Sequence, residues 1–174
     1  MSGEASHTGG MTWLHDRRAP LAGALLAGAA LGAALASERV LGLVPCALCL
    51  WERWPYRIAI GLLLLAAALP RLARPALVLG TLVILAGAAL TALHVGVEQS
   101  WWPSPLPECA APVLGGGSIA DRLARMPATP AKPCDEPTFP IPGLPVSMAA
   151  GNLAFALALA GFLAMSAAAR WRRT

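Results

Sequence analysis

The sequence predicts an all-α fold, an integral membrane four-helix bundle with one long, mostly irregular outer loop that contains a short surface helix. Of the 174 residues, 57% are hydrophobic and only 13% are charged, against about 25% charged in a typical soluble domain. The mean hydropathy is +0.62, and the apolar residues gather in four long blocks. There is too little polar surface to enclose a water-soluble core.

Composition also excludes other classes of protein. The formal net charge of +4 is scattered around apolar segments and forms no basic face, so we expect no nucleic-acid partner. The apolar blocks exclude a disordered chain, and the 17 Gly and 16 Pro residues that break them follow no collagen or coiled-coil period. The expected partner is the lipid bilayer.

The first predicted span, 19–36, follows a tail at 1–18 that ends in Arg17 and Arg18. A cleavable signal peptide is the alternative, because Ala34, Leu35 and Ala36 form an A-x-A pattern. The 18-residue run is longer than the usual core of about 7–15 residues in a signal peptide. We therefore favour a retained helix.

The second and third predicted spans, 56–69 and 76–93, flank a turn at 70–75 that is bracketed by prolines. A helix needs about 20 residues to cross the hydrocarbon. The second block is too short unless its helix starts upstream, near Cys46. Pro70 and Pro75 predict a tight helical hairpin.

The fourth predicted span, 146–169, is followed by a basic tail at 170–174. Arg residues flank the spans in the first tail, in the turn and in this last tail, which places these three segments on the cytoplasmic side. The outer side then holds 37–55 and 94–145. In 94–145 five acidic residues outnumber three basic ones.

All four cysteines fall in the two outer segments, Cys46 and Cys49 in the first, Cys109 and Cys134 in the second. Disulfides persist on the outer side of a membrane, whereas thiols stay reduced in the cytoplasm. An even count suggests two pairs, for which three connectivities exist.

Cys46 and Cys49 form a C-x-x-C motif that several kinds of site share. Haem attachment needs His after the second Cys, where Leu50 stands, and zinc needs further ligands at short spacing, so we expect no metal. A structural bond would close only a tiny loop. A redox-active pair fits best, because Pro45 suits position N1 of a helix whose positive end favours thiolate.

Arg53 lies on the same helical stripe as Cys46 and Cys49, at i, i+3 and i+7. It is either a snorkelling anchor or a cation that stabilises negative charge on sulfur or on a bound quinone. Glu52 is expected to face the lipid headgroups or to pair locally. His94, at the outer end of the third span, is either a cap or a site residue.

The second outer segment contains eleven of the 16 prolines and is expected to be mobile. Its short helix is predicted at 118–126, with Ser118 as the cap, lying on the membrane surface. Bridging Cys109 to Cys134 would contribute roughly 3.5 kcal/mol through loop entropy. Such a disulfide is either structural or open to an attacking thiolate.

These motifs resemble the disulfide bond formation protein B (DsbB) family. The resemblance covers about 20–170 and rests on C-x-L-C-x-x-E-R from Cys46 to Arg53, on Trp-Pro-Ser-Pro before Cys109, and on Pro-Cys-Asp around Cys134. It departs after Cys134, where 136–142 is richer in proline than is usual for the family. The first 16 residues have no counterpart.

The resemblance implies a multi-pass protein of the bacterial inner membrane with its redox cysteines in the periplasm. It would re-oxidise a periplasmic thioredoxin-fold oxidase of the DsbA type and pass the electrons to ubiquinone or menaquinone, the known chain that keeps the periplasm oxidising. Cys109 and Cys134 would be the disulfide that the partner attacks, and Cys46 and Cys49 the pair next to the quinone. Arg53 and His94 would line the quinone site.

Two other functions stay open at this point. A quinone-coupled enzyme of the vitamin K epoxide reductase type also uses a C-x-x-C motif in a helical bundle, although the Glu-Arg pair after Cys49 favours DsbB. The other is a non-enzymatic membrane scaffold whose disulfides only stiffen the outer loops.

Overall fold

The computed structural model describes residues 7–109, 118–124, 132–141 and 143–171, and these residues are helical or irregular, with no strand. The only strand-like pairing among them is an isolated bridge between Cys46 and Lys132. The all-α prediction is confirmed.

Four long helices and three short ones make up the described chain. The long helices are α1 (His7–Arg39), α2 (Ala47–Ala68), α3 (Ala73–Glu98) and α5 (Met148–Trp171). The short ones are the 3-10 turns η1 (Pro70–Leu72) and η2 (Pro107–Cys109) and the helix α4 (Ile119–Ala124).

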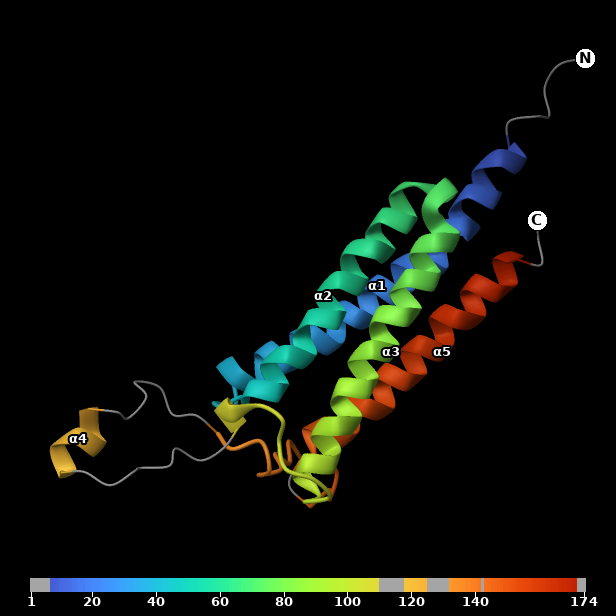
Figure 1. Cartoon of the computed structure of the whole chain (residues 1–174). Coiled ribbons are helices and arrows are strands. Elements are labelled where there is room, and N and C mark those ends of the chain that lie inside the picture. Colours follow the sequence, from blue (N-terminus) through green and yellow to red (C-terminus); the bar gives the residue numbers. More distant parts are fainter. Residues whose placement is uncertain (1–6, 110–117, 125–131, 142, 172–174) are drawn as a thin grey trace, which may run out of the picture.

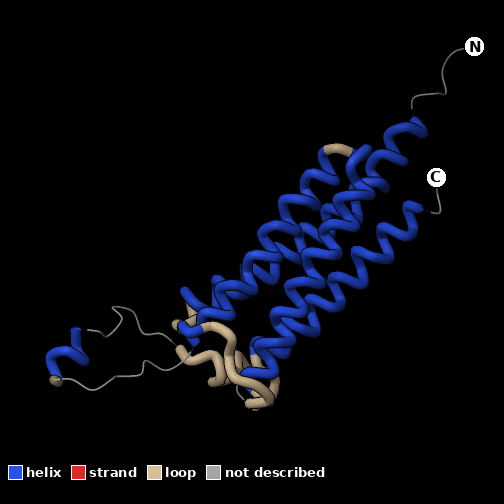
Figure 2. The backbone as a smooth tube through the Cα atoms, viewed as in Figure 1, coloured by secondary structure: helices blue, strands red, loops and turns tan. Residues whose placement is uncertain are grey.

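The long helices run side by side along their lengths (Figure 1). Helix α3 packs against α2 and α5, and α1 packs against α2 and α5. The start of α1, the turn between α2 and α3, and the end of α5 lie at one end of the molecule. The irregular segments gather at the opposite end (Figure 2), so the Arg-rich segments and the cysteines are separated by the length of the helices.

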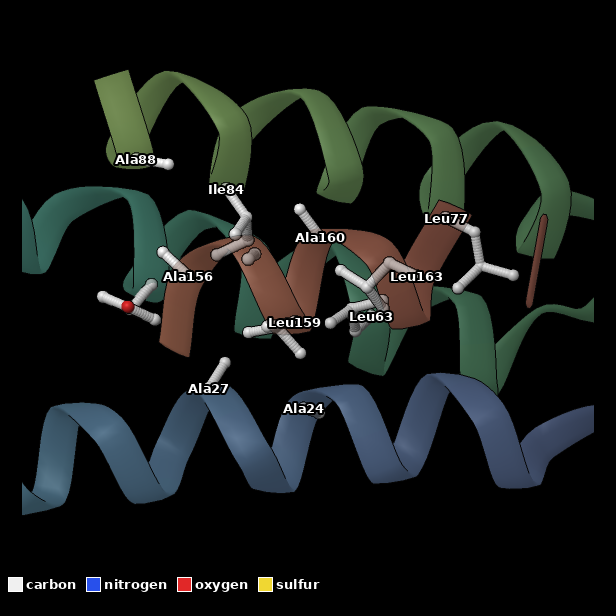
Figure 3. Packing of buried hydrophobic residues seen from close by; sticks show 12 residues of the cluster. Ala24, Ala27, Leu63, Leu77, Ile84, Ala88, Ala156, Leu159, Ala160 and Leu163 are labelled. Carbon is white, nitrogen blue, oxygen red and sulfur yellow. The ribbon is translucent and has the colours of Figure 1, made fainter. Parts of the chain in front are cut away.

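Small residues let these helices approach closely. Ala27 of α1 points toward Leu159 of α5, and both belong to the core cluster that also holds Ala24, Leu63 and Leu163 (Figure 3). A Cβ on Gly23 would lie 2.7 Å from a methyl carbon of Leu163. Association of helices in lipid depends on such packing, because no hydrophobic effect drives them together there.

Three segments are long and apolar enough to cross a membrane: Arg17–Arg39, Pro70–Glu98 and Met148–Trp171. Large apolar side chains such as Leu25, Leu82 and Met165 are exposed on them, as expected of surfaces in contact with lipid. These three segments coincide with the first, third and fourth predicted spans in length and composition. Helix α2 is not in this set; its N-terminal half carries Glu52, Arg53 and Arg57.

Helix α2 begins at Ala47, upstream of the apolar block at 56–69, and reaches 22 residues in this way. In the second outer segment, α4 starts after Ser118, whose hydroxyl accepts a hydrogen bond from the Asp121 amide at 3.2 Å. Asp121 in turn accepts from the Ser118 amide at 3.1 Å, which makes a reciprocal cap. The remainder of the predicted helix, 125–126, lies outside the described residues.

Gly87 allows α3 to pass close to a proline inside α2. A Cβ at this position would lie 2.8 Å from Cβ of Pro55 and 3.0 Å from its Cγ. Because the proline ring is rigid and fixed in the helix, the two helices would have to separate.

We therefore expect Gly87→Ala to destabilise the protein by about 1–3 kcal/mol, the usual cost of overpacking. Thermal unfolding in detergent would measure it. Gly61→Ala is the matched control, since beyond its chain neighbours and the backbone of its own helix no atom of the described residues lies within 4 Å of the Cβ it would add. Equal melting temperatures for the two variants would contradict the close approach.

Candidate active site

Cys46 is the N-cap of α2, and its sulfur takes the place of the usual oxygen cap. Its Sγ accepts a hydrogen bond from the Cys49 amide at 3.3 Å, and the two sulfur atoms are 2.9 Å apart. Pro45 therefore precedes the cap and does not occupy N1 as predicted. Both thiols still belong to the first turn, at the positive end of the helix.

This position favours the thiolate of Cys46. The hydrogen bond from the Cys49 side chain lowers the pKa of Cys46, and the amides of Cys49 and Leu48 lower it further. Burial and the negative charge of Glu52 oppose the change, but the net pKa is below its ordinary value of 9.0. Of the two thiols at the N-terminus of α2, Cys46 and Cys49, the thiol of Cys46 therefore ionises more readily.

His94 of α3 joins this cysteine to a buried carboxylate. Its Nε2 lies 3.5 Å from Cys46 Sγ, and its Nδ1 lies 2.7 Å from Glu52 Oε1. Because a carboxylate only accepts, the hydrogen bond assigns the proton to Nδ1. Nε2 then presents its lone pair to the sulfur and is placed to take the thiol proton.

Glu52 lies in the site and not where its sequence position predicted. It does not face the headgroups but is buried, with 7% of its surface exposed. Its second oxygen accepts a hydrogen bond from Asn152 Nδ2 at 2.8 Å. A buried carboxylate needs such partners, and it finds them on two other helices.

Asn152 of α5 completes this hydrogen-bonded group, and the sequence analysis did not single it out. It accepts a hydrogen bond from the Tyr56 hydroxyl at 2.6 Å and donates one to Thr91 Oγ1 at 3.1 Å. One signal was available: a polar side chain inside an apolar span marks a functional or packing site.

Arg53 is held by an acidic residue of α1 rather than by solvent. Its guanidinium lies 2.8 Å from a carboxylate oxygen of Glu38, and its side chain is 10% exposed against 39% for Glu38. Its Nε is buried and has no hydrogen-bond partner among the described residues. Arg53 therefore retains an unused donor.

A cavity of about 390 Å³ connects these groups. Arg53, His94 and the two cysteines Cys46 and Cys49 line it, as do Asn152 and Phe155 of α5. Alanines of α1 line the facing wall, at positions 29, 30, 33 and 34. The volume suits a small organic ring, since ligand pockets run from about 300 to 1,000 Å³.

Cys109 and Cys134 form a disulfide, whereas Cys46 and Cys49 are free. The bonded pair packs with Cys46, Leu48 and Val97 in one buried cluster, against which Cys49 also packs. The bridge from Cys46 to Lys132 aligns the segment before Cys134 with the start of α2. All four cysteines thus meet at one end of the helices.

The expectation that a mobile loop leaves this disulfide open to attack does not hold for the described residues. Cys109 is 4% exposed and Cys134 is 1% exposed. A reagent or partner has to displace neighbouring residues before it can reach either sulfur. Much of the segment between them, at 110–117 and 125–131, lies outside the described residues.

Comparison with known proteins agrees with the geometry. Residues 16–166 match the family described as "Disulfide bond formation protein DsbB". The chain is also 30% identical over 137 residues to RP370, an uncharacterized protein of Rickettsia prowazekii (strain Madrid E), a match that covers 78% of each chain. No solved structure matches. With the family match spanning most of its length and the C-x-x-C pair at its site, this chain belongs to the DsbB family of disulfide bond formation proteins.

Proposed function

We propose that this protein re-oxidises a periplasmic thioredoxin-fold oxidase of the DsbA type and passes the electrons through two cysteine pairs to a membrane quinone, ubiquinone or menaquinone. The observation that carries this proposal is one buried cluster that holds Cys46, Cys109 and Cys134, with the partly buried Cys49 packed against it. Thiol–disulfide exchange needs sulfur atoms in direct contact. Two pairs in one cluster are placed for it.

The electrons move by two successive exchanges. Once the residues that cover the bond between Cys109 and Cys134 are displaced, a thiolate of the reduced partner attacks it, and the partner's second thiol then releases the mixed disulfide. The partner leaves oxidised, and Cys109 and Cys134 become a dithiol. This dithiol reduces a Cys46–Cys49 disulfide in the same way. Two electrons and two protons thereby reach Cys46 and Cys49, and the disulfide between Cys109 and Cys134 re-forms.

His94 and Glu52 handle the proton at Cys46. His94 Nε2, 3.5 Å from the sulfur, accepts the thiol proton, and the Glu52 carboxylate at Nδ1 stabilises the resulting imidazolium. General bases act in this geometry when their second nitrogen is held by a carboxylate. The thiolate stays stabilised by the first turn of α2.

The cavity fits a quinone ring by its size and by the groups on its walls. When bound, a quinone supplies the acceptor for the two electrons and two protons of the dithiol. Arg53, whose Nε has no partner in the described part of the chain, and His94 would hold the polar edge of the ring. The alanine wall of α1 and Phe155 would contact its apolar part.

The membrane arrangement follows from the charges at the helix ends. Arg71 in the turn between α2 and α3, Arg74 in the first turn of α3 and Arg170 in the last turn of α5 belong to the end of the molecule opposite to the cysteines, and Arg17 begins the apolar part of α1. Positively charged ends usually stay cytoplasmic, and this supports our proposal that the cysteines face the periplasm of a protein in the inner membrane. Helix α2 would complete a bundle of four spans, with its charged first turns at the membrane surface.

Cys49→Ala is expected to abolish quinone reduction, because no Cys46–Cys49 disulfide can then be regenerated. Absorbance of the quinone, with a reduced thioredoxin-fold dithiol protein as donor, measures it. Leu50→Ala, at an exposed position one residue on, is the control and should retain turnover. Persistent quinone-dependent turnover in the Cys49 variant would refute this electron path.

Arg53→His is expected to raise the KM for quinone roughly tenfold or more, since a hydrogen bond to a charged group is worth about 1.5–3 kcal/mol. The KM for the protein partner should change little. Arg57→His is the matched control, because Arg57 is exposed and its guanidinium lies over the Trp54 ring. Equal increases in the KM values for the quinone and for the protein partner would show that Arg53 is only a structural anchor.

The lowered pKa of Cys46 predicts the pH profile of its alkylation. In Cys49→Ser and Cys49→Ala variants with the second disulfide intact, Cys46 is the one free thiol among the four cysteines. In the serine variant a hydroxyl replaces the donor, so the rate with iodoacetamide should rise with a midpoint below pH 9.0. The alanine variant lacks the donor, and its midpoint should be higher. Identical midpoints would exclude the hydrogen bond as the cause.

A further inference from the structure

We propose that the reduced protein binds a thiophilic divalent metal ion, Zn²⁺ above all, through Cys46 Sγ, Cys49 Sγ and His94 Nε2, and that the bound ion blocks thiol exchange. These three ligand atoms all lie within 4.8 Å of one another. They come from two helices that already pack together, α2 and α3. The proposed brake acts on the proposed relay, but metal binding itself does not depend on that function.

The distances fit a tetrahedral ion. With Zn–S near 2.3 Å and Zn–N near 2.05 Å, a tetrahedral angle separates the two ligand atoms by about 3.6 Å. Cys46 Sγ and His94 Nε2 are 3.5 Å apart. The two sulfur atoms, now at 2.9 Å, must open to about 3.8 Å, which a rotation of the partly exposed Cys49 side chain provides.

The surroundings supply what metal-bound histidines usually have. A ligating imidazole commonly donates its other N–H to a carboxylate, which fixes the tautomer and raises its basicity. His94 Nδ1 makes this contact with Glu52 at 2.7 Å. Asn152 holds the second oxygen of Glu52, so the carboxylate is fixed in turn.

The chemistry of the donors selects the ion. Two thiolates and one imidazole suit Zn²⁺, whereas Mg²⁺ and Ca²⁺ prefer oxygen ligands. Binding releases the two thiol protons, and the thiolates neutralise the charge of the ion. The three ligands border the cavity, which leaves the fourth position for a water molecule.

The site exists in one redox state only. A Cys46–Cys49 disulfide has no thiolate to offer, so the oxidised protein loses two of its three ligands. The bound ion in turn holds both sulfurs away from exchange, since a thiolate bound to zinc is a weaker nucleophile than a free one. Metal would therefore accumulate on reduced protein and stop turnover until it is removed.

The test is a titration of the reduced full-length protein with Zn²⁺ and with Co²⁺, whose absorption reports tetrahedral thiolate ligation. Quinone and partner are left out. We expect one ion per chain, with release of two protons. A variant with Cys109→Ser and Cys134→Ser should bind one ion per chain as well, because the second pair supplies no ligand. If this variant does not fold, the stoichiometry is measured on wild type with all four cysteines reduced.

Two variants distinguish a residue that binds the ion directly from a residue that only contacts such a ligand. His94→Gln keeps the size of the side chain and should lower the affinity for Zn²⁺ by at least a hundredfold. Glu52→Gln should lower it about 10- to 100-fold, as is usual for a carboxylate behind a ligating histidine. His15→Ala, in the N-terminal part of α1, is the control and should bind as wild type does.

Unchanged cobalt absorption in His94→Gln, or equal binding by the oxidised protein, would overturn the three-ligand site. Turnover with quinone and partner, measured with and without Zn²⁺, then tests the brake. Binding without inhibition would overturn the brake alone. Binding in a protein that shows no turnover even without metal would instead overturn the proposed function.

Discussion

The buried carboxylate of Glu52 is the constraint on which the site depends. A carboxylate in a protein interior costs several kcal/mol unless its oxygens are hydrogen-bonded. Glu52 of α2 meets this need with His94 of α3 and Asn152 of α5. The same contacts that satisfy the charge thus fix three helices relative to one another at the end where the cysteines lie.

The sulfur atom of Cys46, to which we assign the redox chemistry, also stabilises the fold. Cys46 caps α2 through the Cys49 amide, contacts His94 and pairs through its backbone with Lys132. A change in the charge of this sulfur therefore alters a helix cap, a hydrogen bond to α3 and a contact with the outer segment at the same time. The proposed chemistry at Cys46 would therefore affect the segment that carries Cys134.

The sequence predicted what depends on local spacing and failed where distant helices meet. The stripe of Cys46, Cys49 and Arg53 follows from helical periodicity, and all three line the cavity. The burial of Glu52 follows from contacts with α3 and α5, which no local pattern reveals. Its neighbour Arg53 shows the same limit, because the partner Glu38 belongs to another helix.

The spans show a similar division. Three apolar blocks were long enough for their composition alone to identify them. The second apolar block was short because the first turns of α2 carry charged residues of the proposed site. These charges lower the mean hydropathy of the helix below that of a typical span. The charged residues at the proposed site therefore make α2 harder to recognise as a span from hydropathy.

The ion pair of Arg53 and Glu38 is asymmetric, and this asymmetry determines which partner can leave. Arg53 is almost fully buried, whereas Glu38 is 39% exposed and can be solvated when the pair opens. In the proposed reaction, an anion that forms in the cavity would compete with Glu38 for the buried guanidinium of Arg53. Glu38 would neutralise Arg53 until that anion develops and would then release it, so α1 would contribute to the proposed chemistry although it carries no cysteine.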